Sequence, residues 1–296
     1  QKTGHGDLVE TQRGEWYMVF LTSRPLTEQG RCITGRETGI EKVEWRQDNW
    51  LYLSNKKQVA RQKVEAPDLP EHKFIADRKT INFDTTNIDT NFQSLRIPMT
   101  NDWVNQTDRQ GYLRLIGRES LSSCFEQSLI ARRVQEHHTQ ASTCIEFFPE
   151  NFQQMAGLVC YYNTTHYHYL YITGDDIGSY SGKKFLNILS CDDNKTSHPI
   201  SQPIEVSNID KIFLKAGFNG EIIQFYYAIS IDKIELTWQK IGPELDGSIL
   251  SDDYVVHTER GYSPCFTGAF IGIACQDLSG QKIHADFEFF TYQEIT

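Results

Sequence analysis

The sequence predicts an all-β protein in which a small N-terminal β-sheet unit precedes a large antiparallel β-sandwich. Runs of β-branched and aromatic residues, alternating with a period of two, recur along most of the chain. Turn signals rich in Gly, Asn and Asp separate these runs, and no segment keeps a helical pattern beyond two turns. Strands of this kind pack as antiparallel sheets with one buried face and one exposed face.

Residues 1–65 contain the first group of short strands. Residues 8–22 read as two strands around a turn at Arg13-Gly14, and residues 39–53 read as two more around a polar turn. Such strands suit a blade of a β-propeller or one sheet of a barrel. Because a propeller needs at least about four blades, and these residues supply one or two, we expect this domain to be incomplete.

Residues 66–80 are predicted to form a linker between two domains. Pro67 and Pro70 lie among charged residues and cannot donate backbone hydrogen bonds to a sheet. An extended connection is therefore expected here.

Residues 81–296 are predicted to form the sandwich. Ten strand-like runs occupy residues 112–117, 128–134, 142–148, 156–162, 167–173, 185–190, 211–218, 222–230, 269–275 and 286–292. The dipeptide Asn219-Gly220 between two of these runs predicts a two-residue hairpin loop of type I′, which needs positive φ at both central residues.

The charge of the chain argues against several classes of partner. A formal net charge of -10 and a pI of about 5.4 disfavour nucleic acids and anionic membrane surfaces. No apolar run approaches the roughly 20 residues that a membrane-spanning helix needs. We therefore predict neither a nucleic-acid partner nor a membrane partner.

The seven cysteines are scattered without a C-x-x-C pair, so neither a disulfide framework nor a zinc site is indicated, and buried free thiols are expected. Three sequons begin at Asn105, Asn163 and Asn194, and they matter only in a glycosylating compartment. A signal peptide on a longer parent would not be visible here, so cytoplasmic and secreted locations both stay open.

Paired aspartates and a tyrosine-rich stretch are the other candidates for binding. Asp175-Asp176, Asp192-Asp193 and Asp252-Asp253 are expected to be solvated loop charges, because a calcium cage needs six or more convergent oxygen ligands. Calcium would require that the fold bring carboxylates together, so no metal and no cofactor are assigned. Tyrosines between Tyr161 and Tyr171 could stack on sugars, but strand alternation places about half of them in the core.

Three groups of motifs resemble one known family. They are GHGDLVET (4–11) with GEWYMVFLTSRP (14–25); GRETGIEKVEW (35–45); and LIGRESLSS (115–123) with FFPENFQQMAGLVCYYN (147–163) and FTGAFIGIACQDLSG (266–280). In order and spacing they resemble the last blades of the five-bladed β-propeller of family 43 glycoside hydrolases of the β-xylosidase type, followed by their concanavalin A-like β-sandwich, a jelly roll. The resemblance covers nearly the whole chain.

This resemblance implies inverting hydrolysis of terminal xylosyl, and often arabinofuranosyl, units from xylo-oligosaccharides or aryl xylosides. Inversion requires a general acid and a general base with carboxyl groups about 6.5–9.5 Å apart. The family places these carboxylates, and a third that tunes the acid, in blades that would precede Gln1. We therefore expect no catalytic residue in this chain, no activity of the chain alone, and the missing N-terminal blades as its partner. Family members often form oligomers, so a homo-oligomer is also considered.

Three residues match supporting positions of the family's pocket. His5, in GHG, matches a histidine at the pocket floor; Arg36, in GRET, matches a substrate-contacting arginine; Phe266 matches a sandwich aromatic that closes the pocket. Taken alone, each could be structural: a strand-end histidine, a salt-bridged arginine and a core phenylalanine. The neighbouring carboxylates Asp7 and Glu37 are not assigned as acid and base, because proximity in sequence does not provide reach to a substrate.

The alternative function is a non-catalytic carbohydrate-binding or structural module formed by the β-sandwich. Only a general likeness to lectin sandwiches supports it. The GHG and GRET motifs have no evident role in such a module, and they favour the glycosidase.

Overall fold

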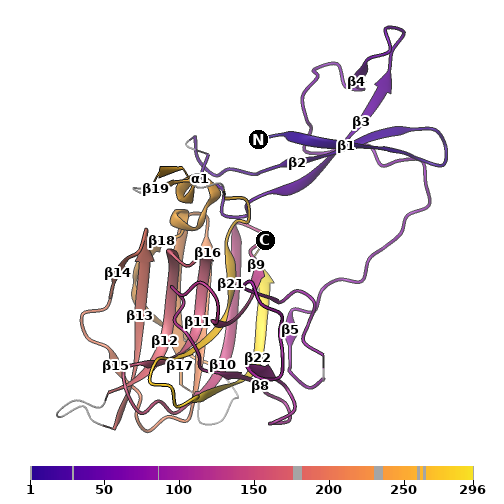
Figure 1. Cartoon of the computed structure of the whole chain (residues 1–296). Helices are drawn as coiled ribbons and strands as arrows, with labels where there is room; N and C mark the ends of the chain where they lie inside the picture. The colour runs from indigo at the N-terminus through magenta and orange to yellow at the C-terminus, as the bar shows by residue number, and fades with distance from the viewer. Residues whose placement is uncertain are drawn as a thin grey trace.

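The first strands form a separate four-stranded antiparallel sheet that projects from one end of the sandwich (Figure 1). Its strands follow chain order: β1 (Gly4–Glu10), β2 (Trp16–Thr22), β3 (Glu37–Trp45) and β4 (Leu51–Leu53). The computed structural model describes residues 2–28, 30–85, 87–175, 182–229, 236–258, 261–262 and 265–295. Four strands are the size of one propeller blade, as predicted for this part of the chain.

The N-terminal sheet buries little of its own surface. Tyr17 and Val43 are buried, whereas every residue of the edge strand β1 is exposed. Trp45 remains 51% exposed, although its ring packs edge-to-face against Trp16 at a centroid distance of 6.1 Å. An exposed edge strand is a template for further strand pairing, so this sheet has the character of a piece of a larger β-structure.

An ion pair between a buried carboxylate, Glu41, and a partly exposed arginine, Arg61, ties this sheet to the chain that follows it. The Glu41 side chain is inaccessible to solvent and accepts hydrogen bonds from the Arg61 backbone N–H at 3.0 Å and from Arg61 Nε at 2.9 Å. Burial alone would raise the pKa of Glu41, but the hydrogen bonds from Arg61 outweigh it and hold the pKa below its ordinary value.

The stability that Glu41 contributes is expected to depend on pH. Because its folded-state pKa is lowered, the contribution is complete above the unfolded-state pKa of about 4.3 and is lost as the pH falls through the folded-state value. At neutral pH, Glu41→Gln should lower the free energy of unfolding by about 1.5–3 kcal/mol. Urea unfolding of wild type and variant at several pH values should show this difference shrinking below about pH 4; a pH-independent difference would contradict the prediction.

The rest of the chain forms a sandwich of two antiparallel sheets, reached through a long extended connection (Figure 1). The first sheet has the order β18 (Gln239–Asp246), β17 (Ile222–Ala228), β16 (Lys211–Asn219), β10 (His138–Phe147), β22 (His284–Glu294), β8 (Leu113–Ile116) and β7 (Val104–Asn105), with β5 (Thr80–Ile81) also pairing with β22. The second sheet has the order β14 (Lys195–Ser197), β13 (Lys183–Asp192), β12 (His166–Asp175), β11 (Gln154–Asn163), β21 (Phe270–Asp277), β9 (Ser128–Arg133) and β6 (Gln93–Ser94), with β15 (Ile204–Glu205) pairing with β13.

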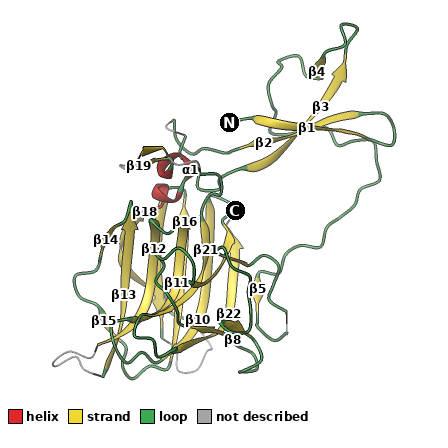
Figure 2. Cartoon of the chain, viewed as in Figure 1, coloured by secondary structure: helices red, strands yellow, loops and turns green. Residues whose placement is uncertain are grey.

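Short elements close the end of the sandwich nearest the N-terminal sheet, where Figure 2 shows the helical turns. They are the 3-10 helix η2 (Gly247–Leu250), the helix α1 (Asp252–Val255), and the small hairpin of β19 (His257–Thr258) and β20 (Gly261–Tyr262). None of the helices among the described residues is long and apolar enough to cross a membrane.

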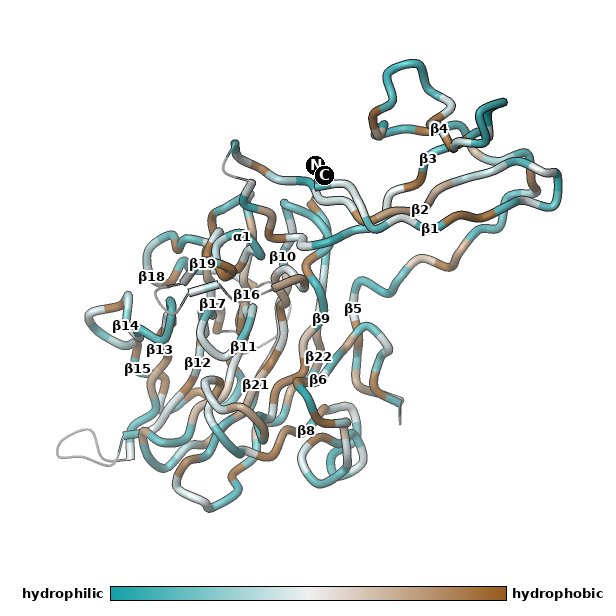
Figure 3. Tube along the Cα trace, turned by 45° about the horizontal axis from the view of Figure 1, so that its top comes forward, coloured by the Kyte–Doolittle hydropathy of each residue, from teal (hydrophilic) through white to brown (hydrophobic). Residues whose placement is uncertain are grey.

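The core lies between the two sheets. Alternate residues of facing strands supply it, including Leu113 and Leu115 from β8, Ile145 from β10, and Leu158 from β11, all with 0% exposure. Brown, hydrophobic stretches recur along the strands in Figure 3, while the loops at the sandwich ends are largely teal. The predicted all-β sandwich is therefore confirmed, since the alternation identified the faces that are removed from water.

All ten predicted runs of the sandwich coincide with strands, although residue 230, the end of one run, lies outside the described residues. Sequence reasoning missed β18 and the short strands β5, β6, β7, β14 and β15. In β18 only Ile241 and Leu245 are buried, and Gly242 and Pro243 interrupt its pattern. A proline is tolerated there because β18 is an edge strand.

The hairpin between β16 and β17 is present, but the predicted turn residues were wrong by one position. Asn219 pairs with Ile222, so the loop consists of Gly220 and Glu221. Gly220 has a φ of 62°, whereas neither Asn219 nor Glu221 has a positive φ. A glycine at the first central position is typical of a type II′ turn instead of the predicted type I′ turn.

Candidate functional site

A pocket of about 160 Å³ lies where the N-terminal sheet meets the sandwich. Its walls come from both parts of the chain. The lining residues are Lys2, Leu21, Ser23, Cys32, Gly35 and Arg36 from the N-terminal part, and Asp252, Asp253, Val256, Tyr262, Cys265 and Phe266 from the sandwich.

The connection between β2 and β3 brings the two parts together. We call residues 23–28 and 30–36 the docking segment, because they leave the N-terminal sheet and pack on the sandwich. Ile33 has 0% exposure and belongs to the sandwich core. Its carbonyl accepts a hydrogen bond from the Ala269 N–H at 2.7 Å, and the Ala269 carbonyl accepts one from the Val134 N–H at 2.9 Å. The docking segment thus extends the hydrogen bonding of the sandwich.

Two glycines allow this close approach. A Cβ atom added to Gly35 would lie 2.5 Å from the Gly268 nitrogen, and one added to Gly268 would lie 2.5 Å from the Gly35 nitrogen. Both glycines also have positive φ, 66° and 71°. Only glycine satisfies the contact distance and the backbone conformation together.

Arg36 and Phe266, both predicted as pocket residues, meet beside this contact. The Arg36 guanidinium carbon lies 3.9 Å from the centroid of the Phe266 ring, and both residues line the pocket. The Phe266 side chain is 50% exposed, so the alternative of a core phenylalanine is wrong. A guanidinium on an aromatic face keeps its in-plane donors available for a ligand.

His5 does not line the pocket that contains this pair. It is an exposed residue of β1, with a φ of 48°, at a register shift in the pairing of β1 with β2. Gly4, the neighbour of His5, pairs with Leu21, which is one of the residues that line the pocket. The His5 side chain is not among the described residues that line it. The assignment of His5 to the pocket floor stays a prediction.

The sandwich anchors both halves of the Arg36–Phe266 pair. Arg133 Nη2 donates to the Thr34 carbonyl at 2.8 Å and to the Arg36 carbonyl at 3.0 Å. Asp252 Oδ1 accepts hydrogen bonds from the Gly268 N–H at 2.9 Å and from the Tyr162 hydroxyl at 2.7 Å. Burial and this carboxylate together raise the pKa of Tyr162, which therefore stays a neutral donor.

Two further arginines join the docking segment to the sandwich. Arg24 donates to both carboxylate oxygens of Glu37, to Glu136 at 2.7 Å and to the Gln135 carbonyl at 2.8 Å. The Arg31 guanidinium carbon lies 4.5 Å from the centroid of the Tyr254 ring. Burial, together with a hydrogen bond to Asp192, raises the pKa of Tyr254 to about 12.

The two carboxylates of the pocket each have one oxygen held by a structural partner, while Asp253 Oδ2 is buried without a hydrogen-bond partner among the described residues. Asp252 holds two donors, and Asp253 pairs with Lys2. The prediction that Asp252 is a solvated loop charge was therefore wrong, because its carboxylate points into the protein and accepts hydrogen bonds from Tyr162 and Gly268. Asp176, from another of the predicted pairs, lies outside the described residues. Within the described ranges, no three His, Cys, Asp or Glu side chains gather closely enough to hold a metal ion.

The tyrosines of β11 and β12 do not present an open stacking surface. Tyr161, Tyr167, Tyr169 and Tyr171 lie on the face of their sheet opposite the main core, yet each is at most 3% exposed. Tyr162 belongs to the main core on the other face. All seven cysteines are free, and five of them are buried, as expected for structural thiols.

Sequence reasoning missed Arg133, Asp252 and Tyr262 as neighbours of the pocket. These residues stand in no recognisable motif, and only the docking of distant segments brings them to one place. The glycine of FTG in 266–280 was within a quoted motif, and its pairing with Gly35 required the tertiary contact.

Comparison with known proteins agrees with this architecture. Residues 80–293 match the family described as "Beta xylosidase C-terminal Concanavalin A-like domain", and residues 1–51 match "Glycosyl hydrolases family 43". The chain is 40% identical to a β-xylosidase of Bacillus subtilis over 99% of its length and 54% of that protein. It is 37% identical to xylosidase/arabinosidase 43B of Humicola insolens, over its full length and 53% of that protein.

A solved structure is similar over the same range. The crystal structure of xylan β-1,4-xylosidase from Bacillus halodurans matches with a TM-score of 0.90 at 40% identity, covering 99% of this chain and 54% of that one. The chain therefore spans about half the length of the relatives it matches.

Proposed function

The chain belongs to glycoside hydrolase family 43, as the end of a catalytic domain followed by the β-xylosidase-type concanavalin A-like domain, and we propose that it completes the substrate pocket of a glycosidase. The proposed enzyme releases terminal xylosyl units from xylo-oligosaccharides. Relatives named xylosidase/arabinosidase extend the proposal to terminal arabinofuranosyl units.

The observation that carries this proposal is the Arg36–Phe266 pair across the junction. Sugars offer hydroxyl groups in the ring plane and an apolar ring face. Arg36 supplies fixed donors for hydroxyls, and the half-exposed Phe266 ring supplies an apolar wall. A neutral, hydroxyl-rich ligand fits this combination, whereas a nucleic acid would be repelled by the net charge of -10.

The reaction also needs two carboxyl groups, which we assign to the propeller blades of the other half of the enzyme. In an inverting mechanism one protonates the leaving oxygen and the other activates a water molecule, at a separation of about 6.5–9.5 Å. Asp252 and Asp253 line the pocket, and each has one carboxylate oxygen, Oδ1, that is held by structural partners. This chain accordingly contributes substrate contacts, and the proton transfers belong to the preceding blades.

The test is reconstitution of activity. The 296-residue chain alone should not hydrolyse 4-nitrophenyl β-D-xyloside, and co-production with the N-terminal half of the Bacillus subtilis β-xylosidase should generate turnover. Arg36→Ala should then lower kcat/KM about 10- to 100-fold, the value of a hydrogen bond from a charged donor. Arg96→Ala, which removes an exposed arginine that binds the Cys124 carbonyl, is the matched control and should have little effect.

Two results would overturn the proposal. Turnover by the chain alone would place catalytic carboxylates within it. Binding of xylo-oligosaccharides to the chain alone by calorimetry, with no activity on reconstitution, would favour the carbohydrate-binding module. The burial of the tyrosines on the second sheet speaks against that alternative.

A further inference from the structure

We propose that Arg133 is a positioning residue, which holds the main chain around Gly35 so that Arg36 faces the pocket. Its catalytic consequence rests on the proposed function, while its structural consequence does not. Arg133 is the last residue of β9 and pairs with Phe270 of β21. It therefore projects from a rigid strand of the sandwich.

The geometry of Arg133 restricts the peptide group that precedes Gly35 and the peptide group that follows Arg36. A single nitrogen, Nη2, donates to the carbonyls of Thr34 and Arg36 at 2.8 and 3.0 Å. Two carbonyls that converge on one cationic donor cannot rotate independently without losing a charge-assisted hydrogen bond. The orientation of the peptide that follows Arg36 is thereby set by a side chain of the other part of the molecule.

This restraint is needed because Gly35 adds no stiffness of its own. Glycine explores φ of either sign with little steric cost, so the direction of the Arg36 side chain is poorly determined by its own backbone. The contact with Gly268 limits translation of the segment, and the Arg133 hydrogen bonds limit rotation of its peptide groups. Together they place the guanidinium over Phe266.

The partner ring is held from the same body. Asp252 binds the N–H of Gly268, two residues after Phe266, and is itself held by the Tyr162 hydroxyl. Both residues of the Arg36–Phe266 pair are thus anchored to the sandwich, Arg36 through Arg133 and Phe266 through Asp252. This explains physically how a domain outside the propeller can determine the precision of a pocket wall.

Arg133 differs from an interface residue that only joins the two parts. Arg24 makes that kind of connection, through Glu37, Glu136 and the Gln135 carbonyl, without contacting the main chain at residues 34–36. If Arg133 acted only as such a link, its loss would lower stability without a specific dependence on Arg36.

The experiment compares Arg133→Met, which keeps the length of the side chain and removes its donors, with Arg133→Lys, which keeps a cationic donor. Arg96→Met is the matched control, because Arg96 also donates to a main-chain carbonyl, at 3.0 Å, but away from the pocket. In the reconstituted enzyme, Arg133→Met should lower kcat/KM about 10- to 100-fold, as misplacement of a contact group does. Arg133→Lys should recover part of this loss.

A double-mutant cycle distinguishes positioning from general destabilisation. In an Arg36→Ala background, Arg133→Met should cost less than about twofold in addition, because its target is gone. Full additivity of the two effects on kcat/KM would overturn the proposal. Equal losses in Arg133→Met and Arg96→Met would overturn it as well.

Amide exchange of the 296-residue chain separates this proposal from the proposed function. Arg133→Met should speed exchange in residues 32–38 about tenfold, the loss expected for one charge-assisted hydrogen bond, and Arg96→Met should leave these residues unchanged. If reconstitution yields no activity but exchange responds in this way, the restraint of residues 32–38 by Arg133 stands and the glycosidase assignment falls. Unchanged exchange in Arg133→Met overturns the positioning role whatever the activity.

Discussion

Replacing Gly35 with alanine is expected to loosen the N-terminal sheet from the sandwich, weakening their packing by about 2–5 kcal/mol. The new Cβ would lie 2.5 Å from the Gly268 nitrogen and 2.7 Å from its Cα, both main-chain atoms that cannot rotate away. The φ of 66° adds the cost of a left-handed conformation for a residue with a side chain. Limited proteolysis should release the N-terminal residues while the sandwich stays protected.

Gly14→Ala separates the two contributions to this effect. Gly14 also has a positive φ, 77°, but a Cβ there would meet nothing within 4 Å. It should therefore cost only about 1–2 kcal/mol, and the difference between the variants measures the backbone contact. Comparable protease resistance in Gly35→Ala and Gly14→Ala would mean that the glycine contact does not hold the two parts together.

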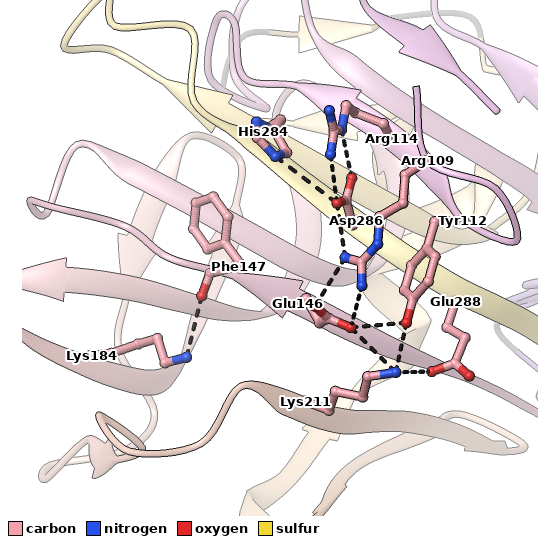
Figure 4. Close-up of polar contacts among 10 residues, drawn as sticks. All are labelled: Arg109, Tyr112, Arg114, Glu146, Phe147, Lys184, Lys211, His284, Asp286 and Glu288. Carbon is pink, nitrogen blue, oxygen red and sulfur yellow. Dashed lines mark hydrogen bonds and ion pairs between the residues drawn. The ribbon is translucent and has the colours of Figure 1, made fainter. Parts of the chain in front are cut away.

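Arg114→Met is expected to destabilise the sandwich by about 3 kcal/mol, because it leaves a buried carboxylate poorly compensated. Asp286 has a side chain only 5% exposed and accepts hydrogen bonds from Arg114 Nε at 2.7 Å and Nη2 at 2.8 Å. Figure 4 shows these contacts, with Arg109 bridging Asp286 and Glu146. Burial would raise the pKa of Asp286, but the two arginines hold it below the ordinary range, so the group is ionised at neutral pH.

Removing both charges tests the physical reason. The double variant Arg114→Met/Asp286→Leu should recover most of the lost stability, since an apolar pair of similar volume avoids the desolvation of an unpaired charge. Lys183→Met, which breaks the exposed pair with Glu205 at 2.9 Å, should cost less than about 1 kcal/mol. Urea unfolding provides the free energies; an Arg114→Met effect no larger than that of Lys183→Met would contradict the prediction.

The strands could be predicted from the sequence because their alternation reflects burial directly. The run at 156–162 became β11 and the run at 167–173 became β12, each with one face in the main core. Where few side chains are buried, the signal fails. β18 was missed because it is an edge strand with two buried apolar residues, and the β16–β17 loop was shifted because Asn219 continued the strand.

The candidate site was only partly predictable. Motif resemblance identified Arg36 and Phe266, and the fold brings them to 3.9 Å. Motif resemblance did not identify Arg133 or Asp252, whose roles come from hydrogen bonds to main-chain atoms. Because every residue has a main-chain carbonyl, and nearly every residue an N–H, the side chains around the bonded main-chain atom do not predict such a hydrogen bond.

The sequence by itself determined the all-β class, the two kinds of β-unit and the family, because alternation and motifs are local properties of the chain. Only the tertiary structure decided which surfaces meet. The pocket depends on Gly35 against Gly268 and on Arg133 reaching the Thr34 and Arg36 carbonyls, contacts between segments that are remote in the chain. Such contacts arise where the N-terminal sheet packs on the sandwich. Their distances depend on the shapes of the two packed surfaces, and these shapes exist only once the chain has folded.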